Sequence, residues 1–198
     1  MKKLVLSSKE SANKKEFIES KLFSSSSKEE FISMCEEFLV GLTIEFYDYV
    51  GVMLKYIGFV NPHVTREGDT NCRMDAIIID DVNSIPIEIK SPREVMEINI
   101  KSIRQAFENK VVILSRKFYK SMENTTSLVI AFNYPSERSD VYELVSDIYN
   151  AFGFSIGLIN VRDMLSLVYD IRRCNKKINF DYFNSFVGKF DYEKAFIK

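Results

Sequence analysis

The sequence predicts a mixed α/β fold built around one central sheet. Short apolar segments joined by polar turns fill residues 59–90, which is typical of consecutive β-strands. Residues 98–172 then alternate between helical and strand patterns, which favours strands covered by helices. A long amphipathic helical pattern precedes the first strand. The chain has 198 residues, of which 46% are hydrophobic, so it holds enough apolar material for one domain with a core.

The N-terminal part predicts a polar arm followed by a long helix. Residues 1–28 are rich in Ser and Lys, and we expect one short helix there at 14–23. Ser27 is followed by two glutamates, and a hydroxyl cap with acidic residues in the first turn indicates a helix N-terminus. The helix is expected to run to about Ile57, with Gly58 as its C-terminal stop.

One acidic residue interrupts the apolar side of this helix. Apolar side chains recur at helical spacing and must face a core: Phe38, Leu39, Leu42, Phe46, Tyr49, Val50, Met53 and Ile57. Glu45 lies three positions after Leu42 and four before Tyr49, so we expect it to share the buried side. The alternative is a partly exposed carboxylate at the edge of the apolar stripe.

The elements that follow are expected in a regular order. Three strands are predicted at 59–66, 74–79 and 85–90, with polar turns at 67–71 and 80–83. They are followed by a helix at 98–110, a strand at 127–132, a helix at 140–152, a strand at 154–159 and a helix through about Arg172.

The domain organisation expected from these elements has three parts. The arm at 1–28 precedes an α/β domain at 29–172, and residues 173–198 form an aromatic-rich, helical extension. We expect this extension to pack on the core, and the alternative is a surface for docking a partner.

Bulk composition excludes several classes of protein. The net charge of −1 argues against a free-standing, tight DNA binder. The three cysteines are far apart and indicate reduced thiols in a cytoplasmic protein without a zinc site, and the single histidine, His63, excludes multi-histidine chemistry. Neither a phosphate loop nor a dinucleotide-binding glycine motif is present. We expect no signal peptide and no membrane-spanning segment.

Three charged residues are placed where chemistry is expected. Asp75 begins one predicted strand, while Glu88 and Lys90 lie two apart at the end of the next. Side chains two apart on a strand share a face, so all three should meet across the hairpin. Buried carboxylates are costly unless they are paired or bind a cation. The alternative is an ordinary ion pair on a solvated strand, with Asp75 as a strand-end cap.

This arrangement resembles the PD-(D/E)XK nuclease superfamily, within which the chain is similar to restriction endonucleases. The resemblance covers roughly residues 29–160 and implies a three-layer restriction-endonuclease-like core, with a central mixed β-sheet flanked by helices. Met74 stands where the family pattern has Pro. The family also places an inward acidic residue on the helix before the strands, which implies this role for Glu45, and polar residues behind the metal site, here Lys101 and Gln105.

The residues also support a metal-dependent hydrolysis. Mg²⁺ lowers the pKa of a bound water and clamps phosphate oxygens, and one or two carboxylates suffice to bind it. We expect Asp75, Glu88 and the carbonyl of Ile89 as ligands, with Glu45 at a second cation or a metal-bound water, and Mn²⁺ as a substitute. Lys90 would neutralise the phosphate and hold the attacking water. Gln105 could orient a water, although a solvated helix face is the simpler interpretation of Gln105 and Lys101.

The resulting functional hypothesis is a Mg²⁺-dependent endonuclease acting on double-stranded DNA, such as a type II restriction enzyme or its cleavage subunit. Because the charge is near neutral, we expect a homodimer or a separate recognition subunit to assist binding. Arg66, Arg73 and Arg93 flank the motif and are candidates for contacts to the nucleic-acid backbone. One alternative is a non-catalytic nucleic-acid-binding or assembly subunit that keeps the fold. Another is a nuclease acting on RNA, single strands or repair intermediates.

Overall fold

A six-stranded mixed sheet forms the centre of the protein. The computed structural model describes residues 8–59, 62–64, 74–116 and 120–197. The strands are β1 (Pro62–Val64), β2 (Ala76–Ile78), β3 (Ile85–Ile89), β4 (Ser127–Ala131), β5 (Ile156–Asn160) and β6 (Gly188–Lys189), and they lie in the sheet in sequence order. β1, β2 and β3 pair antiparallel, whereas β3, β4, β5 and β6 pair parallel. The expected mixed α/β architecture is confirmed.

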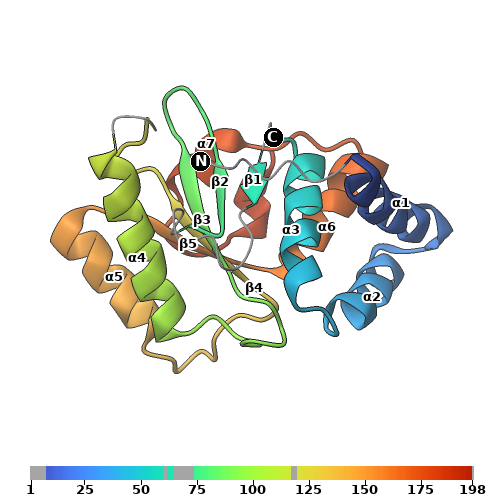
Figure 1. The fold of residues 1–198 in the computed structure, drawn as a ribbon, viewed down its shortest axis with the longest axis horizontal. Coiled ribbons are helices and arrows are strands. Elements are labelled where there is room, and N and C mark those ends of the chain that lie inside the picture. Colours follow the sequence, from blue (N-terminus) through green and yellow to red (C-terminus); the bar gives the residue numbers. More distant parts are fainter. Residues whose placement is uncertain (1–7, 60–61, 65–73, 117–119, 198) are drawn as a thin grey trace.

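Helices cover both faces of this sheet (Figure 1). They are α1 (Ser8–Ser24), α2 (Lys28–Leu39), α3 (Ile44–Ile57), α4 (Ile100–Ser115), α5 (Val141–Phe152), α6 (Val161–Arg173) and α7 (Phe180–Ser185), followed by the 3₁₀ turn η1 (Tyr192–Ala195). α4 and α5 cover one face, α3 and α6 cover the other, and α1 and α2 pack on the outside of α3 and α6. Within the described residues, no helix has the length and apolar character needed to cross a membrane.

Alternation along the strands explains the two cores. Leu128 and Ile130 of β4 pack in the cluster that includes α3 and α6, whereas Val129 and Ala131 pack with α4 and α5. Successive side chains of a strand point to opposite faces, so a strand buried on both faces is largely apolar, and a polar residue in it, such as Glu88 of β3, needs a partner. All five residues of β3 and of β4 are buried.

The predicted helix from residue 28 to Ile57 is wrong in one respect, because two helices occupy this span. The capping by Ser27 is confirmed, since its Oγ accepts the N–H of Glu30 at 3.1 Å. Helix α2 ends at Leu39, and α3 begins at Ile44. Gly41 lies in the break, where a residue with high backbone entropy disfavours a continuous helix.

This break also changes the environment of Glu45. Because the helix restarts at Ile44, Glu45 lies in the first turn of α3, where its side chain is exposed. An acidic side chain interacts favourably with the N-terminal end of a helix dipole. The expectation that Glu45 shares the buried side is therefore wrong, and the alternative of an exposed carboxylate holds.

Helix α1 is longer than the helix predicted in the N-terminal arm, and it belongs to the core. Ile18 and Leu22 are buried in the cluster formed with α2 and α3. The Lys14 ammonium also forms an ion pair with Asp48 of α3. Residues 1–7 lie outside the described part of the chain.

The C-terminal segment is less helical than predicted. Among the described residues after α6, the six residues of α7 and the short turn η1 are the helical ones, and β6 adds a strand to the sheet beside β5. Aromatic packing dictates this path, because Phe183, Phe186 and Phe190 are buried in the core. The ring of Phe186 occupies the place of a side chain at Gly157, where an added Cβ would lie 2.4 Å from its Cζ.

Candidate active site

The hairpin formed by β2 and β3 brings the three predicted motif residues together. Asp75 immediately precedes β2, and Lys90 immediately follows β3. The Asp75 carboxylate accepts the N–H of Ile89 through Oδ2 at 2.8 Å, which links the two strand ends directly. The N–H of Lys90 donates to the carbonyl of Ile130 at 2.8 Å, so β4 holds the end of β3 in place.

The Glu88 carboxylate is buried and held at both oxygens. Its side chain is 2% exposed, and Oε1 lies 2.8 Å from the Nζ of Lys90. Oε2 accepts the Nδ2 amide hydrogen of Asn109 at 3.0 Å, from the facing side of α4. Charge-assisted hydrogen bonds of this kind restrict the side chain to one orientation.

The charges of this cluster influence one another strongly. Burial, followed by the repulsion of Glu88, raises the pKa of the Asp75 carboxyl to about 7. Burial alone would lower the pKa of Lys90, but the Glu88 and Asp75 carboxylates outweigh burial and hold that pKa above its ordinary value. Lys90 is therefore a fixed positive charge, and the site has unfavourable negative charge that a cation would relieve.

A third carboxylate and a phenol belong to the same cluster, and sequence reasoning missed both. Glu94 Oε2 accepts the N–H of Ser91 at 3.2 Å, its Oγ–H at 3.1 Å and the Tyr47 hydroxyl at 3.0 Å. Burial and then the charge of Asp75 raise the pKa of Tyr47 far above its ordinary value, and the Glu94 charge also raises the pKa of Asp75. Tyr47, two residues after Glu45, is thus the α3 residue that reaches the cluster. The spacing Ser91-x-x-Glu94 could have indicated Glu94, because at this spacing an acidic side chain can accept hydrogen bonds from the serine that precedes it.

The other predicted residues lie in varied environments. Gln105 is on α4, one turn before Asn109, and among described buried side-chain atoms its Oε1 is the one without a hydrogen-bond partner. Lys101 is exposed on the same helix. Arg93 is exposed and donates to the carbonyl of Gly41 at 3.3 Å. The candidate contacts Arg66 and Arg73 lie outside the described residues.

The donor set suits a hard divalent cation. In the described part of the chain, no three His, Cys, Asp or Glu side chains converge as metal ligands. Mg²⁺, however, retains several waters and binds through one or two carboxylates with other oxygens. Asp75 and Glu88 offer two carboxylates whose charges repel each other. They would hold such an ion together with the carbonyl of Ile89.

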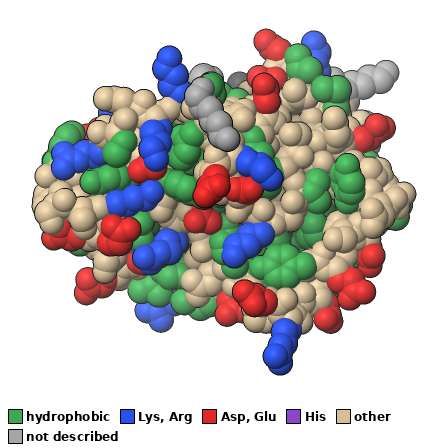
Figure 2. Space-filling view, turned by 180° about the vertical axis from the view of Figure 1, so that it is seen from behind, with side chains coloured by type: hydrophobic (Ala, Val, Ile, Leu, Met, Phe, Trp, Pro, Cys, Tyr) green, Lys and Arg blue, Asp and Glu red, His purple; other side chains and the backbone are tan. Residues whose placement is uncertain are grey.

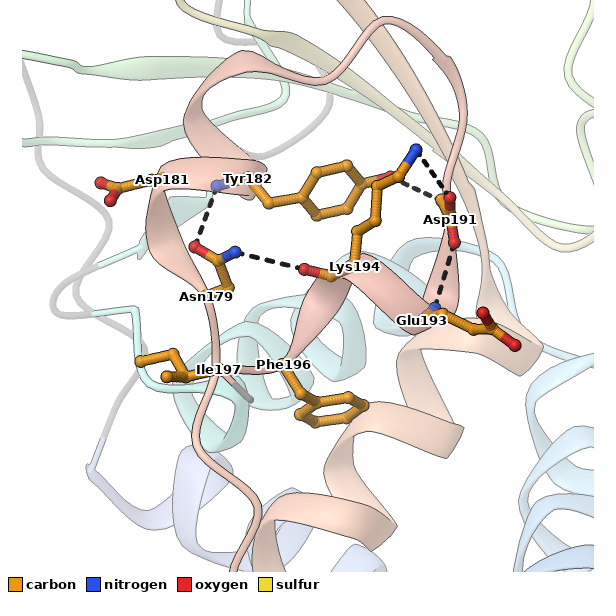
Figure 3. A pocket seen from close by; sticks show the side chains of 8 residues that line it. All are labelled: Asn179, Asp181, Tyr182, Asp191, Glu193, Lys194, Phe196 and Ile197. Atoms are coloured by element: carbon orange, nitrogen blue, oxygen red, sulfur yellow. Dashed lines mark hydrogen bonds and ion pairs between the residues drawn. The ribbon is translucent and has the colours of Figure 1, made fainter.

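A pocket of about 700 Å³ lies elsewhere, between α7 and η1 (Figure 3). The Asp191 carboxylate on its wall accepts the N–H of Glu193 at 3.1 Å and pairs with Lys194 at 3.0 Å. The N–H of Asp191 donates to the Tyr182 hydroxyl at 2.6 Å. These contacts cap η1 and join it to α7, so we assign them to the stability of the C-terminal segment.

Comparison with known proteins relates the fold to a nuclease. The chain is similar to the restriction endonuclease FokI, in a structure determined bound to DNA, with a TM-score of 0.55 and 13% sequence identity. The match covers 96% of this chain and 34% of the FokI chain, so this chain spans about a third of the length of that protein. No family model matches the sequence, and no curated protein matches it. The fold is restriction-endonuclease-like.

Proposed function

We propose that this protein is a Mg²⁺-dependent endonuclease of the PD-(D/E)XK type that hydrolyses phosphodiester bonds in double-stranded DNA. The observation that supports this function most is the meeting of Asp75, Glu88 and Lys90 at the ends of β2 and β3. The Asp75 carboxylate accepts the N–H of Ile89, the residue that follows Glu88, and the Lys90 ammonium lies 2.8 Å from Glu88 Oε1.

Each residue has a role that its environment supports. Asp75, Glu88 and the Ile89 carbonyl would hold the cation, which would supply an activated water and neutralise phosphate charge. Lys90 remains protonated, because its pKa is held above the ordinary value, and its ammonium binds a phosphate oxygen. Glu94 is fixed by Ser91 and Tyr47 at the rim, where it adds negative potential that favours cations.

Assistance with DNA binding is part of this proposal. The net charge is −1, and on the face opposite to that of Figure 1 the basic side chains lie among acidic and apolar ones (Figure 2). Neutralisation of phosphates by lysine and arginine dominates affinity for DNA. We infer that a homodimer or a separate recognition subunit, in a restriction system, supplies further contacts. A cut in both strands by one site per chain also favours a dimer.

The test is cleavage of duplex DNA in Mg²⁺ or Mn²⁺ by the wild type and by Asp75→Ala and Lys90→Ala. Both variants should lose at least 100-fold in rate, since each removes charge stabilisation worth about 3 kcal/mol. Lys177→Ala is the matched control, because Lys177 is an exposed lysine of the C-terminal segment and is not one of the candidate site residues. Equal cleavage by all four proteins would refute the assignment. Single-stranded DNA and RNA in parallel reactions identify the substrate.

A non-catalytic assembly subunit is the second candidate. It is favoured by one observation: Asn109 and Lys90 already provide Glu88 with protein partners at both oxygens, as in a structural ion pair. Titration with Mn²⁺ separates the two functions. The nuclease binds Mn²⁺ with an affinity that Asp75→Ala abolishes, whereas a structural cluster binds none.

A further inference from the structure

Asn109 is a buried amide in contact with the candidate site. It lies on the sheet-facing side of α4, with 3% of its surface exposed, and donates to Glu88 Oε2 at 3.0 Å. Ile103, Ala106 and Ile113 are buried on the same helix. Because packed neighbours surround it and a buried amide without hydrogen bonds costs about 1–3 kcal/mol, Asn109 is held in this position.

The two oxygens of Glu88 have partners of different kinds. Oε2 is bound by a neutral amide on a short side chain that is fixed in the core. Oε1 is bound by the Lys90 ammonium, at the end of four rotatable bonds, with 14% of the side chain exposed. Of the two contacts, the one to Lys90 is therefore the one that can be exchanged without disturbing the core.

We propose that Asn109 is a positioning residue that anchors Glu88 through Oε2, so that Oε1 alone exchanges between the Lys90 ammonium and the divalent cation. The inference rests on the proposed function. A cation and an ammonium repel each other, so binding of the cation at Oε1 displaces Lys90. The displaced ammonium is then available for the phosphate of the substrate. The hydrogen bond from Asn109 to Oε2 keeps the Glu88 carboxylate in its orientation when the contact between Oε1 and Lys90 breaks.

The test is Mn²⁺ binding without DNA, measured by isothermal titration calorimetry. Asn109→Leu keeps the approximate volume of the side chain and removes the amide, and it should weaken Mn²⁺ binding about 10–100-fold, the usual effect of losing a residue that orients a metal ligand. Lys90→Met removes the competing ammonium at similar length and should tighten binding. Ile113→Val is the matched control, because it shortens a buried side chain of the same helix that packs with Met74 and Ile77.

The outcomes separate this inference from the proposed function. Weaker binding by Asn109→Leu, tighter binding by Lys90→Met and an affinity within about twofold of the wild type for Ile113→Val would support it. Wild-type affinity in Asn109→Leu, or unchanged affinity in Lys90→Met, would overturn it and leave the nuclease proposal intact. Absence of Mn²⁺ binding to the wild type would overturn the nuclease proposal, and this inference with it. If Asn109→Leu fails to fold, Asn109→Ser, whose hydroxyl is too short to reach Glu88, carries the same expectation.

Discussion

Replacing Asp75 by Asn should make the metal-free protein more stable. The Asn side-chain oxygen can accept the N–H of Ile89 as Asp75 Oδ2 does at 2.8 Å, so the substitution removes charge with little change in shape. In the wild type, burial and the repulsion of Glu88 act against the ionised carboxylate. A site that binds a cation is expected to lower the stability of the metal-free protein in this way.

The magnitude follows from the pKa. Asp75 moves from an ordinary value of 3.8 to about 7 in the folded protein. One pKa unit corresponds to about 1.4 kcal/mol, so the cost of ionised Asp75 reaches roughly 4 kcal/mol as an upper bound. Because the folded state holds the proton more tightly, the wild type loses this stability as the pH rises from 3.8 to about 7. Asp75→Asn has no carboxyl group to ionise at this position, so the difference in stability between the two proteins grows as the pH rises across that range.

Urea unfolding in EDTA at pH 4, 6 and 8 measures this difference. The free energy of unfolding of the variant should exceed that of the wild type most at pH 8, by up to roughly 4 kcal/mol, and least at pH 4. Mn²⁺ at pH 8 should stabilise the wild type and have no effect on the variant. A variant less stable than the wild type at pH 8 in EDTA would refute the reasoning, because Asp75 would then belong to a stabilising ion pair.

Three further predictions concern stability. Gly157→Ala would place its Cβ 2.4 Å from Cζ of Phe186, so it should lower the free energy of unfolding by at least about 1–3 kcal/mol in urea, and an unchanged midpoint would contradict the packing. Burial alone would raise the pKa of Asp170, but its contacts with Lys176, Tyr192 and Lys28 outweigh burial and lower that pKa. The contribution of Asp170 to the free energy of unfolding is therefore present above pH 3.8 and is lost as the pH falls below that value. Asp170→Asn should therefore lower the free energy of unfolding in urea by about 2 kcal/mol at pH 7, a figure that allows for the solvent exposure of Lys176, and by less at pH 3. An equal loss of stability at the two pH values would count against the ion pairs. Gln105→Leu removes a buried oxygen without a hydrogen-bond partner among the described residues, and it should raise the free energy of unfolding by about 1 kcal/mol; a loss of stability would mean that this oxygen is bonded.

The parts of the site that were predictable depend on local geometry. Strand periodicity and a short polar turn suffice to place Asp75 near Glu88 and Lys90, because register follows from side-chain alternation. The Ser27 cap was predictable for the same reason, since a hydroxyl before two acids acts within one turn.

The remaining parts depend on tertiary packing. Glu45 was assigned to the site on helical spacing across a span where the helix is broken, and the spacing loses its meaning at the break. Tyr47 and Asn109 reach the cluster because α3 and α4 pack on opposite sides of the sheet end, which no local pattern encodes. The C-terminal path depends on how Phe186 fills the space at Gly157.

The hydrogen bond from Ile89 to the Asp75 carboxylate makes one backbone amide a built-in spectroscopic probe. Its proton points at a charged oxygen instead of a carbonyl, so its chemical shift responds directly to whatever that oxygen binds. Once its signal has been assigned among those of the other isoleucines, the ¹⁵N–H group of Ile89 would therefore report ion occupancy in solution. Such a signal can be followed without substrate, turnover or any substitution in the chain.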